Sequence, residues 1–272
     1  TIEGFTRSDE RDLYALPDPT TFTILPWPPR TNAVARMFCD IVNPNEEPFD
    51  GDPRFVLRRN LERAAKMGYT YYVAPELEYF YFKDSKGTEP LDQGDYFDQD
   101  ATDITTDLRR ETVLTLEELG IPVESSHHEA APSQHEIVLR HTDALTMADT
   151  VVTYRLAVKE IAAKHGYYAT LMPKPVSGIN GSGMHTHQSL FEGDRNAFFD
   201  AEDEHRLSDE AKHFIAGLMR HAREITAVTN QTRCQVQRLP APGEVRDPPA
   251  RALLTDIRSQ GQRLPIVNTV HT

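Results

Sequence analysis

The sequence predicts an α+β fold, in which an antiparallel β-sheet is backed by helices. Predicted strands and helices mix along the chain without the regular strand–helix–strand repeat that a parallel sheet requires. Several helices carry clear start and stop signals, and an aromatic-rich strand lies between the first two of them. The chain has 272 residues, of which 39% are hydrophobic, enough for one large domain or two small ones.

The first fifty residues are rich in proline, which fixes φ and removes a backbone donor. Extended segments and turns are therefore expected there, with a short strand at 34–41. The first helix signal follows this strand. Asp52 is a suitable N-cap, Pro53 occupies the first helical position, and Gly68 ends the stripe of apolar residues.

The aromatic run 69–82 predicts a strand interrupted at Pro75, because proline cannot donate to a ladder of hydrogen bonds. Gly120 and Gly166 are positioned to end the next two helices. The remaining predicted elements are helices at 103–119, 143–165 and 208–228, strands at 121–124, 134–139 and 167–172, and a loop at 176–183. After Gln231 the pattern deteriorates, and no further element is predicted.

Charge and composition argue against several classes of protein. The chain has 29 Lys and Arg against 42 Asp and Glu, a formal charge of −13 that repels a phosphate backbone and disfavours a nucleic-acid binder. No apolar run approaches the about 18 residues that indicate a membrane span, and no secretory signal is visible. Cys39 and Cys234 lie far apart without metal-binding spacing, which fits a reducing cytoplasm.

Glu76 and Glu78 are predicted to project from the same face of the aromatic strand, because alternate side chains of a strand share a face. Two carboxylates in this arrangement are costly to bury unless a cation lies between them. The alternative is an edge strand whose acidic face lies in water.

A second cluster spans 124–129 and places two histidines between Glu124 and Glu129. A tight connection containing Pro132 leads from there to Glu136, so the carboxylates at its two ends can converge. A polar hairpin loop without chemistry is the alternative interpretation.

The run 185–191 contains a third cluster. If it is a strand, His185, His187 and Ser189 share one face. The loop 180–183 precedes it, and its backbone amides can approach an anionic ligand closely. A histidine pair on a strand also occurs in purely structural positions.

Together the three clusters offer four carboxylates and one or two imidazoles. Ligation dominated by oxygen suits Mg²⁺ or Mn²⁺, and the absence of cysteine from the clusters argues against a structural zinc site. A cation site of several carboxylates beside a glycine-containing loop suggests binding of ATP phosphates. Phosphoryl transfer is therefore the predicted chemistry.

Several motifs, in order along the chain, resemble the glutamine synthetase family, type I. They are PELEYF at 75–80, HHE at 127–129, QHE at 134–136, MPKP at 172–175 and NGSGMHTHQS at 180–189, after IEGF at 2–5, PDP at 17–19 and LPW at 25–27. The resemblance implies a small N-terminal β-grasp domain and a large catalytic α+β domain. It also implies cytoplasmic homo-oligomeric rings whose sites are shared between neighbouring subunits.

The resemblance implies a domain division as well. Residues 1–15 would be the end of a mostly absent β-grasp domain, and 16–272 would form the catalytic domain, irregular after 231 and incomplete at its C-terminal end. A later family segment that supplies the third protein ligand of the second ion would follow Thr272. The chain is therefore expected to be an internal fragment or a degenerate copy, and to make little glutamine alone.

Individual residues receive roles from the same resemblance. Glu78, Glu129 and Glu136 would hold the first divalent ion, whereas Glu76 and His185 would hold the second. The remaining roles are glutamate binding by Asn180, Gly181, Arg238 and Arg263, ATP binding by Glu124, His187 and Ser189, and catalysis by Arg238, Arg258 and the flap residue Glu244.

The implied activity joins ammonia to the γ-carboxylate of glutamate at the expense of ATP, through a γ-glutamyl phosphate intermediate, with Mg²⁺ or Mn²⁺ as cofactor. The pocket for the amine cannot be identified from the sequence, so a paralogue that uses a polyamine or ethanolamine is one alternative. A non-catalytic remnant that binds metal or nucleotide, or only packs into a hetero-oligomer, is the other.

Overall fold

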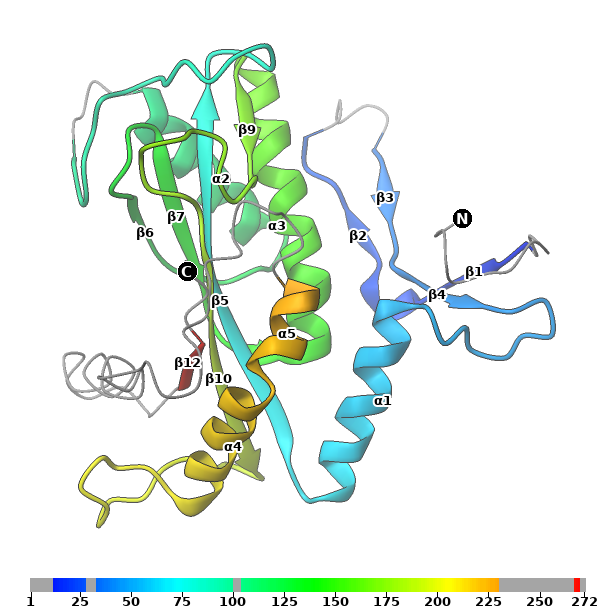
Figure 1. Ribbon diagram of the computed structural model, residues 1–272. Helices are drawn as coiled ribbons and strands as arrows, with labels where there is room; N and C mark the ends of the chain where they lie inside the picture. Colours follow the sequence, from blue (N-terminus) through cyan, green and yellow to red (C-terminus); the bar gives the residue numbers. More distant parts are fainter. Residues whose placement is uncertain (1–11, 28–32, 100–103, 230–266, 270–272) are drawn as a thin grey trace.

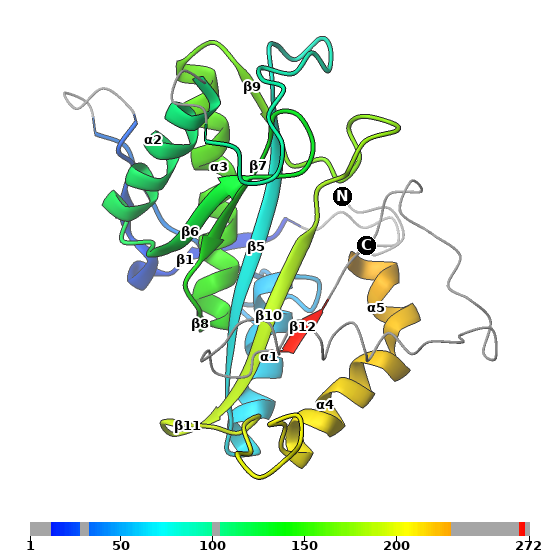
Figure 2. The ribbon, with the colours of Figure 1, turned by 90° about the vertical axis from the view of Figure 1, so that its left-hand side faces the viewer.

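The computed structural model describes residues 12–27, 33–99, 104–229 and 267–269. Its main sheet contains β5 (Thr70–Phe82), β6 (Val123–His128), β7 (Gln134–Leu139), β8 (Thr142–Asp143), β9 (Tyr168–Thr170), β10 (Met184–Glu192), β11 (Arg195–Asn196) and β12 (Val267–Thr269). The strand order is β11-β10-β5-β7-β6, and every pairing is antiparallel. The predicted α+β class is confirmed, and Figures 1 and 2 show β5 as the long central strand.

The strand β5 pairs with four other strands. Along one edge it pairs with β10 and then with β9, and along the other with β8 and then with β7. The predicted interruption at Pro75 is wrong, because β5 runs unbroken through this residue. The register explains why: on the edge that faces β8 and β7, Ala74 and Pro75 fall between the two paired segments. The amide of Tyr81 donates on this edge, and the amide of Glu78 donates on the edge that faces β10, so an amide at position 75 would face the gap and not β10.

Helix caps follow the sequence signals. The side chain of Asp52 accepts the amide of Arg54 at the start of α1 (Pro53–Lys66), and Gly68 takes a φ of 93° beyond its end. Asp143 caps α3 (Ala144–Lys164) in the same way. The other long helix, α2 (Ile104–Glu118), ends before Gly120.

The C-terminal helix differs from the prediction. In place of one helix at 208–228 the structure has α4 (Asp209–Arg220), capped by Ser208, and α5 (Ala222–Thr229). His221 between them has φ −105° and ψ 16°, outside the helical range, which separates the two segments.

The helices α2 and α3 cover one face of the sheet (Figures 1 and 2). Between these layers lies the main apolar core, built from Leu77, Tyr79, Tyr81, Leu108, Leu116, Ile137, Leu139, Tyr154, Val158 and Ile161. Odd-numbered residues of β5 point into this core, so even-numbered residues point to the opposite face. Within the described ranges, no helix combines the length and apolarity needed to cross a bilayer.

The N-terminal segment forms two small ribbons, in which β1 (Tyr14–Pro17) pairs with β4 (Cys39–Val42) and β2 (Thr23–Ile24) with β3 (Ala35–Arg36). A single turn of 3-10 helix at Pro19–Thr21 separates β1 from β2. The strand predicted at 34–41 is divided between β3 and β4. Its middle residue Phe38 bonds instead to the turn, donating to Oγ1 of Thr21 and accepting from the amide of Asp18, each at 2.8 Å.

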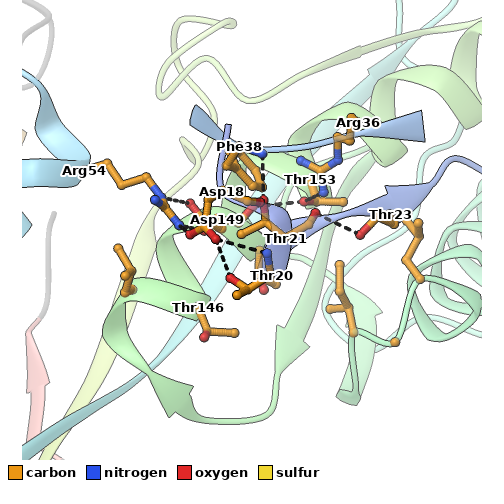
Figure 3. A pocket seen from close by; sticks show the side chains of 15 residues that line it. Asp18, Thr20, Thr21, Thr23, Arg36, Phe38, Arg54, Thr146, Asp149 and Thr153 are labelled. Carbon is orange, nitrogen blue, oxygen red and sulfur yellow. Dashed lines mark hydrogen bonds and ion pairs between the residues drawn. The ribbon is translucent and has the colours of Figure 1, made fainter. Parts of the chain in front are cut away.

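Arg54 anchors this segment to the helical layer. Its guanidinium lies 2.7 Å from Asp18, 2.6 Å from Asp40 and 3.1 Å from Asp149 on α3. Figure 3 shows the contacts of Arg54 with Asp18 and Asp149 beside a cavity of about 280 Å³ between the ribbons and α3. None of the predicted site residues that the structure describes lines the cavity, so these residues form a site elsewhere.

Candidate active site

The sheet face opposite α2 and α3 carries the predicted acidic and imidazole side chains. His185 on β10 lies directly opposite Glu76 on β5, and Glu78 on β5 lies opposite Glu136 on β7. Directly opposite residues of an antiparallel pair project from the same face. Strand register therefore gathers these four side chains, which come from three separate parts of the sequence.

Both histidines of β10 contact Glu76. Oε1 of Glu76 is hydrogen-bonded to Nε2 of His187, and Oε2 lies 3.4 Å from Nδ1 of His185. Burial acts to raise the pKa of Glu76, but the two imidazoles outweigh it and hold this pKa at about 2. The bond to Glu76 in turn raises the pKa of His185. Glu76 is thus an ionised ligand group between two imidazoles.

Glu136 is nearly fully buried, with 4% of its surface exposed. Burial, together with the charges of Glu76, Glu129 and Glu78, raises the pKa of Glu136 to about 9. Burial also raises the pKa of Glu78. Carboxyl groups perturbed in this direction lack a compensating positive charge and would gain one from a bound cation.

Glu129 follows the last residue of β6, and its Oε1 lies 2.9 Å from Nε2 of His127. Ligand atoms of His127, Glu129 and Glu136 all lie within 4.8 Å of one another. The structure thus brings Glu129 and Glu136 together and adds His127, to which the sequence analysis gave no role. Its signal is its position opposite Glu136, which is visible only once the register of β6 and β7 is known.

An aromatic pair packs against His127. The ring of Phe97 stacks on the imidazole at a centroid distance of 4.7 Å, and Tyr96 meets it edge-on at 5.5 Å. Phe97 has a φ of 61°, which residues with a Cβ rarely adopt, and its amide donates to the carbonyl of His128 at 3.0 Å. These contacts fix the ring of His127 beside Glu129.

Gln134 connects the carboxylates to the glycine-containing loop. Its Nε2 donates to Oε2 of Glu78 at 2.8 Å and to the carbonyl of Gly181 at 2.9 Å. A Cβ on Gly181 would lie 2.5 Å from the carbonyl oxygen of Pro173, so only glycine permits this close approach. Gln134 is not among the predicted site residues, although it lies two residues before Glu136 and hence on the same strand face.

The other predicted site residues have simpler surroundings or cannot be placed. Ser189 is buried on β10 opposite Tyr72, Asn180 is exposed in the loop, and Glu124 lies at a bulge of β6. Arg238, Glu244, Arg258 and Arg263 lie outside the described residues. The neighbouring strand β12 pairs with β10 along Thr186–Gln188.

The donor set fits a divalent cation that prefers oxygen. Glu76, Glu78, Glu129 and Glu136 supply carboxylates, and imidazoles lie beside them. The raised pKa of buried Glu136 shows that ionising this carboxyl beside the other carboxylates is unfavourable when no cation is bound. Hard carboxylate oxygens with few nitrogens suit Mg²⁺ or Mn²⁺.

An antiparallel sheet that carries clustered carboxylates on one face and helices on the other defines an α+β protein with a candidate metal site. Family models agree with this class: "Glutamine synthetase, catalytic domain" matches residues 50–264, and "Glutamine synthetase, beta-Grasp domain" matches 1–44. The chain belongs to the glutamine synthetase family.

Curated relatives support the same membership. The chain is 50% identical over 243 residues to a glutamine synthetase of Methanosarcina mazei, covering 88% of this chain and 54% of the relative. It is 51% identical over 250 residues to one of Mycolicibacterium smegmatis, covering 90% and 56%. The chain thus spans about half the length of the curated relatives it matches.

Solved structures share the fold. A GmaS complex with ADP superposes with a TM-score of 0.79 at 33% identity, covering 88% of this chain and 55% of that one. A glutamine synthetase of Plasmodium falciparum gives a TM-score of 0.77 at 24% identity, over 85% of this chain and 51% of that one. The second likeness concerns the fold alone.

Proposed function

We propose that this chain carries the metal and nucleotide site of an ATP-dependent ligase that joins ammonia to the γ-carboxylate of glutamate, through γ-glutamyl phosphate. The observation that carries the proposal is the convergence of four carboxylates and three imidazoles on one sheet face, next to the Gly181 loop. The glutamine synthetase relatives support the choice of reaction.

In this proposal, Glu78, Glu129 and Glu136 hold one divalent ion, and Glu76 and His185 hold a second. Bound Mg²⁺ or Mn²⁺ would neutralise charge on the transferring phosphoryl group. Glu76 is suited to its role because its low pKa keeps it ionised. The contact of His127 with Glu129 orients that carboxylate.

The loop between β9 and β10 would bind glutamate through Asn180 and Gly181. Gln134 fixes the position of this loop relative to Glu78, so the substrate carboxylate and the metal ligands share one rigid support. ATP would contact His187 and Ser189 along β10, and Glu124 on β6. Arg238, Arg258, Arg263 and Glu244 complete the proposal as groups that bind substrate or phosphoryl oxygens.

The proposal extends to organisation as well. A β-grasp portion would precede the catalytic portion, homo-oligomeric rings would form from the whole protein, and the location would be cytoplasmic. The two family matches, to 1–44 and 50–264, support the presence of both portions.

The test measures Mn²⁺-dependent ATP binding by this chain. It also measures γ-glutamyl hydroxamate formation from glutamate, ATP and hydroxylamine by a version extended to the length of the curated relatives, because the chain alone is expected to make little glutamine. Glu129→Gln keeps the shape of the side chain but removes a ligand charge, so both signals should fall about 100-fold or more. Glu89→Gln is the matched control, because Glu89 is exposed and paired only with Lys83 among the described side chains. Its signals should equal those of the unsubstituted chain.

Equal ATP binding with and without Mn²⁺ would contradict the proposal. So would a Glu129→Gln variant that matches the unsubstituted chain in both measurements. Binding of ATP with no hydroxamate from the extended version would leave a nucleotide-binding protein and reject the ligase reaction.

A further inference from the structure

A second buried cluster lies on the helix side of the carboxylates. It consists of Asp92, from the loop after β5, His128 on β6, His135 on β7 and Arg109 on α2. His128 and His135 are 2% and 0% exposed. Because neighbouring residues of a strand face opposite ways, this cluster lies directly behind His127 and Glu136.

Asp92 is the centre of the cluster. Its Oδ1 accepts the backbone amides of Ser133 at 2.7 Å and Gly94 at 3.0 Å, and lies 3.0 Å from Nε2 of His128. Its Oδ2 lies 3.5 Å from Nε2 of His135, which is long for a hydrogen bond, and neither of these two buried atoms has a hydrogen-bond partner among the described residues. A carboxylate so enclosed depends on all of these contacts.

The hydrogen-bond partners of His128 and His135 determine which of their ring nitrogens carry protons. Arg109 can only donate, and it lies 2.8 Å from Nδ1 of His135, so that nitrogen accepts and the proton of His135 sits on Nε2, facing Asp92. Nδ1 of His128 lies 2.6 Å from the carbonyl oxygen of Glu129, which can only accept. The carboxylate of Asp92 at Nε2 can also only accept, so both nitrogens of His128 donate, Nδ1 to Glu129 and Nε2 to Asp92, and the ring is the doubly protonated imidazolium.

The same assignment argues against a metal ion in this cluster. Ligand atoms of Asp92, His128 and His135 lie within 4.8 Å of one another, as in a zinc site. A metal on Nε2 of His135 would need a proton on Nδ1, directed at the guanidinium of Arg109. Two donors would then face each other in a buried position, so hydrogen bonding is the better explanation.

The cluster holds the turn that carries the candidate metal ligands. At one end of the turn, His128 of the cluster binds the carbonyl of Glu129. At the other end, Asp92 accepts the amide of Ser133, and the Oγ of Ser133 accepts the amides of Leu91 at 2.6 Å and Asp92 at 2.9 Å. Gly94 allows the close approach, because a Cβ there would lie 2.6 Å from Nε2 of His128. Both ends of the turn are thus attached to one buried carboxylate.

We propose that Asp92 is a positioning residue, which through His128 and Ser133 fixes the turn between β6 and β7 and so sets the placement of Glu129 and Glu136. Its effect on the metal site rests on the proposed function, whereas its effect on the turn does not. Asp92 touches neither candidate ligand side chain, and acts only through the backbone of the turn.

The first experiment measures amide hydrogen exchange without metal. In Asp92→Asn the two imidazole donors lose their charged acceptor, so amides of the turn, residues 129–134, should exchange about 10-fold faster. Leu207→Ala is the matched control, because Leu207 lies in a separate apolar cluster with Phe198 and Ala211. It should lower global stability without selective exchange in the turn. Unchanged protection of the turn in Asp92→Asn would overturn the proposal, whatever the metal result.

The second experiment titrates Mn²⁺ and Zn²⁺ separately, with free Mn²⁺ followed by electron paramagnetic resonance. Asp92→Asn should weaken Mn²⁺ binding about 10-fold or more, and Asp98→Asn, an exposed carboxylate of the same loop, should leave it unchanged. Zn²⁺ binding that survives Glu129→Gln but is lost in Asp92→Asn would overturn the proposal by making the cluster a metal site. Failure of the unsubstituted chain to bind Mn²⁺ would instead reject the proposed function, while hydrogen exchange still decides the role of Asp92.

Discussion

Glu136 is a carboxyl group buried among three other carboxylates. With a pKa raised to about 9, it is mostly protonated at neutral pH when no cation is bound, so a glutamine at this position is a close mimic of its metal-free state. In EDTA we expect Glu136→Gln to leave the melting temperature nearly unchanged at about pH 4.5 and to raise it at pH 7, because at neutral pH the glutamate, unlike the glutamine, must take up a proton on folding. The same substitution should remove most of the rise in melting temperature that Mn²⁺ causes in the unsubstituted protein.

Glu136 also makes the stability of the fold depend on pH in a definite direction. A carboxyl whose pKa is raised by folding destabilises the protein as pH rises above its unfolded value of 4.5. In EDTA, the unsubstituted protein should therefore lose stability relative to Glu136→Gln between about pH 5 and pH 9. Parallel melting curves for the two proteins over this range would contradict the burial of an unpaired carboxyl at this position.

His185 and His187 offer a second comparison of single residues. Both contact Glu76, but the proposal assigns only His185 to the metal. We expect His185→Ala to weaken Mn²⁺ binding, and His187→Ala to weaken ATP binding while most Mn²⁺ affinity is kept. Calorimetric titrations of each ligand test the division, which identical Mn²⁺ curves for the unsubstituted protein and His185→Ala would refute.

At this scale the sequence predicts which residues share a strand face, but not which strands lie side by side. Alternation alone places Glu76 with Glu78. The roles of Gln134 and His127 depend on the register of β5, β7 and β6, which tertiary packing decides. Asp92 was beyond prediction, because its partners lie 36 and 41 residues away along the chain.

Among the elements, the N-terminal ribbons depend on Arg54, whose side chain is 10% exposed and pairs with three aspartates. Arg54→Met would leave these charges facing one another. We expect a loss of about 2–3 kcal/mol in unfolding free energy, less than for a fully buried pair because the aspartates are 15–21% exposed. Urea unfolding measures it, with Arg59→Met as the control, since the one ion pair of Arg59 within the described part of the chain is with exposed Asp50.

Acid should weaken this attachment. Hydrogen bonds from Thr20 and Arg54 lower the pKa of Asp18 from 3.8 to about 2. The stabilisation is therefore present above about pH 4 and is lost as pH falls through about 2. The stability difference between the unsubstituted protein and Arg54→Met should shrink over this interval. A difference that stays constant down to pH 2 would contradict the ion pairs.

The Gly181 loop is the second element with a definite expectation. An alanine there would push its Cβ against the carbonyl of Pro173, which cannot yield without moving the backbone. Gly181→Ala should cost about 1–3 kcal/mol of stability and weaken glutamate binding through the displaced loop. Gly87→Ala, which meets nothing within 4 Å, should be close to neutral in urea unfolding and in glutamate titration. Equal behaviour of the two variants would exclude the close approach.

Elements with strong local signals were predictable from sequence, and elements decided by partners were not. Asp52 and Asp143 begin helices because capping is a local hydrogen bond. Pro75 was misjudged because its tolerance depends on a gap between two partner strands. The division of α4 from α5 at His221 also has no sequence signal that we recognise.

For the whole molecule, family membership and fold agree with the α+β class predicted from the chain. The described sheet joins segments that are far apart in sequence: β5 meets β7 about 60 residues later and β10 more than 100 residues later. The pairings of β5 with β7 and β10 are therefore long-range contacts, whereas β6–β7 and β10–β11 are local hairpins.

The position of β5 between its four partners has a consequence for the order in which the protein forms on the ribosome. The capped helices and the β6–β7 hairpin can form from local segments as they emerge, but Glu76 cannot meet His185 until β10 has been synthesised and has closed against β5. Closing so large a loop is slow, because its entropy is lost before any ladder bond is gained. The contacts of His185 and His187 with Glu76 therefore form late, and the edge of β5 that pairs with β10 stays exposed in the nascent chain until β10 is in place.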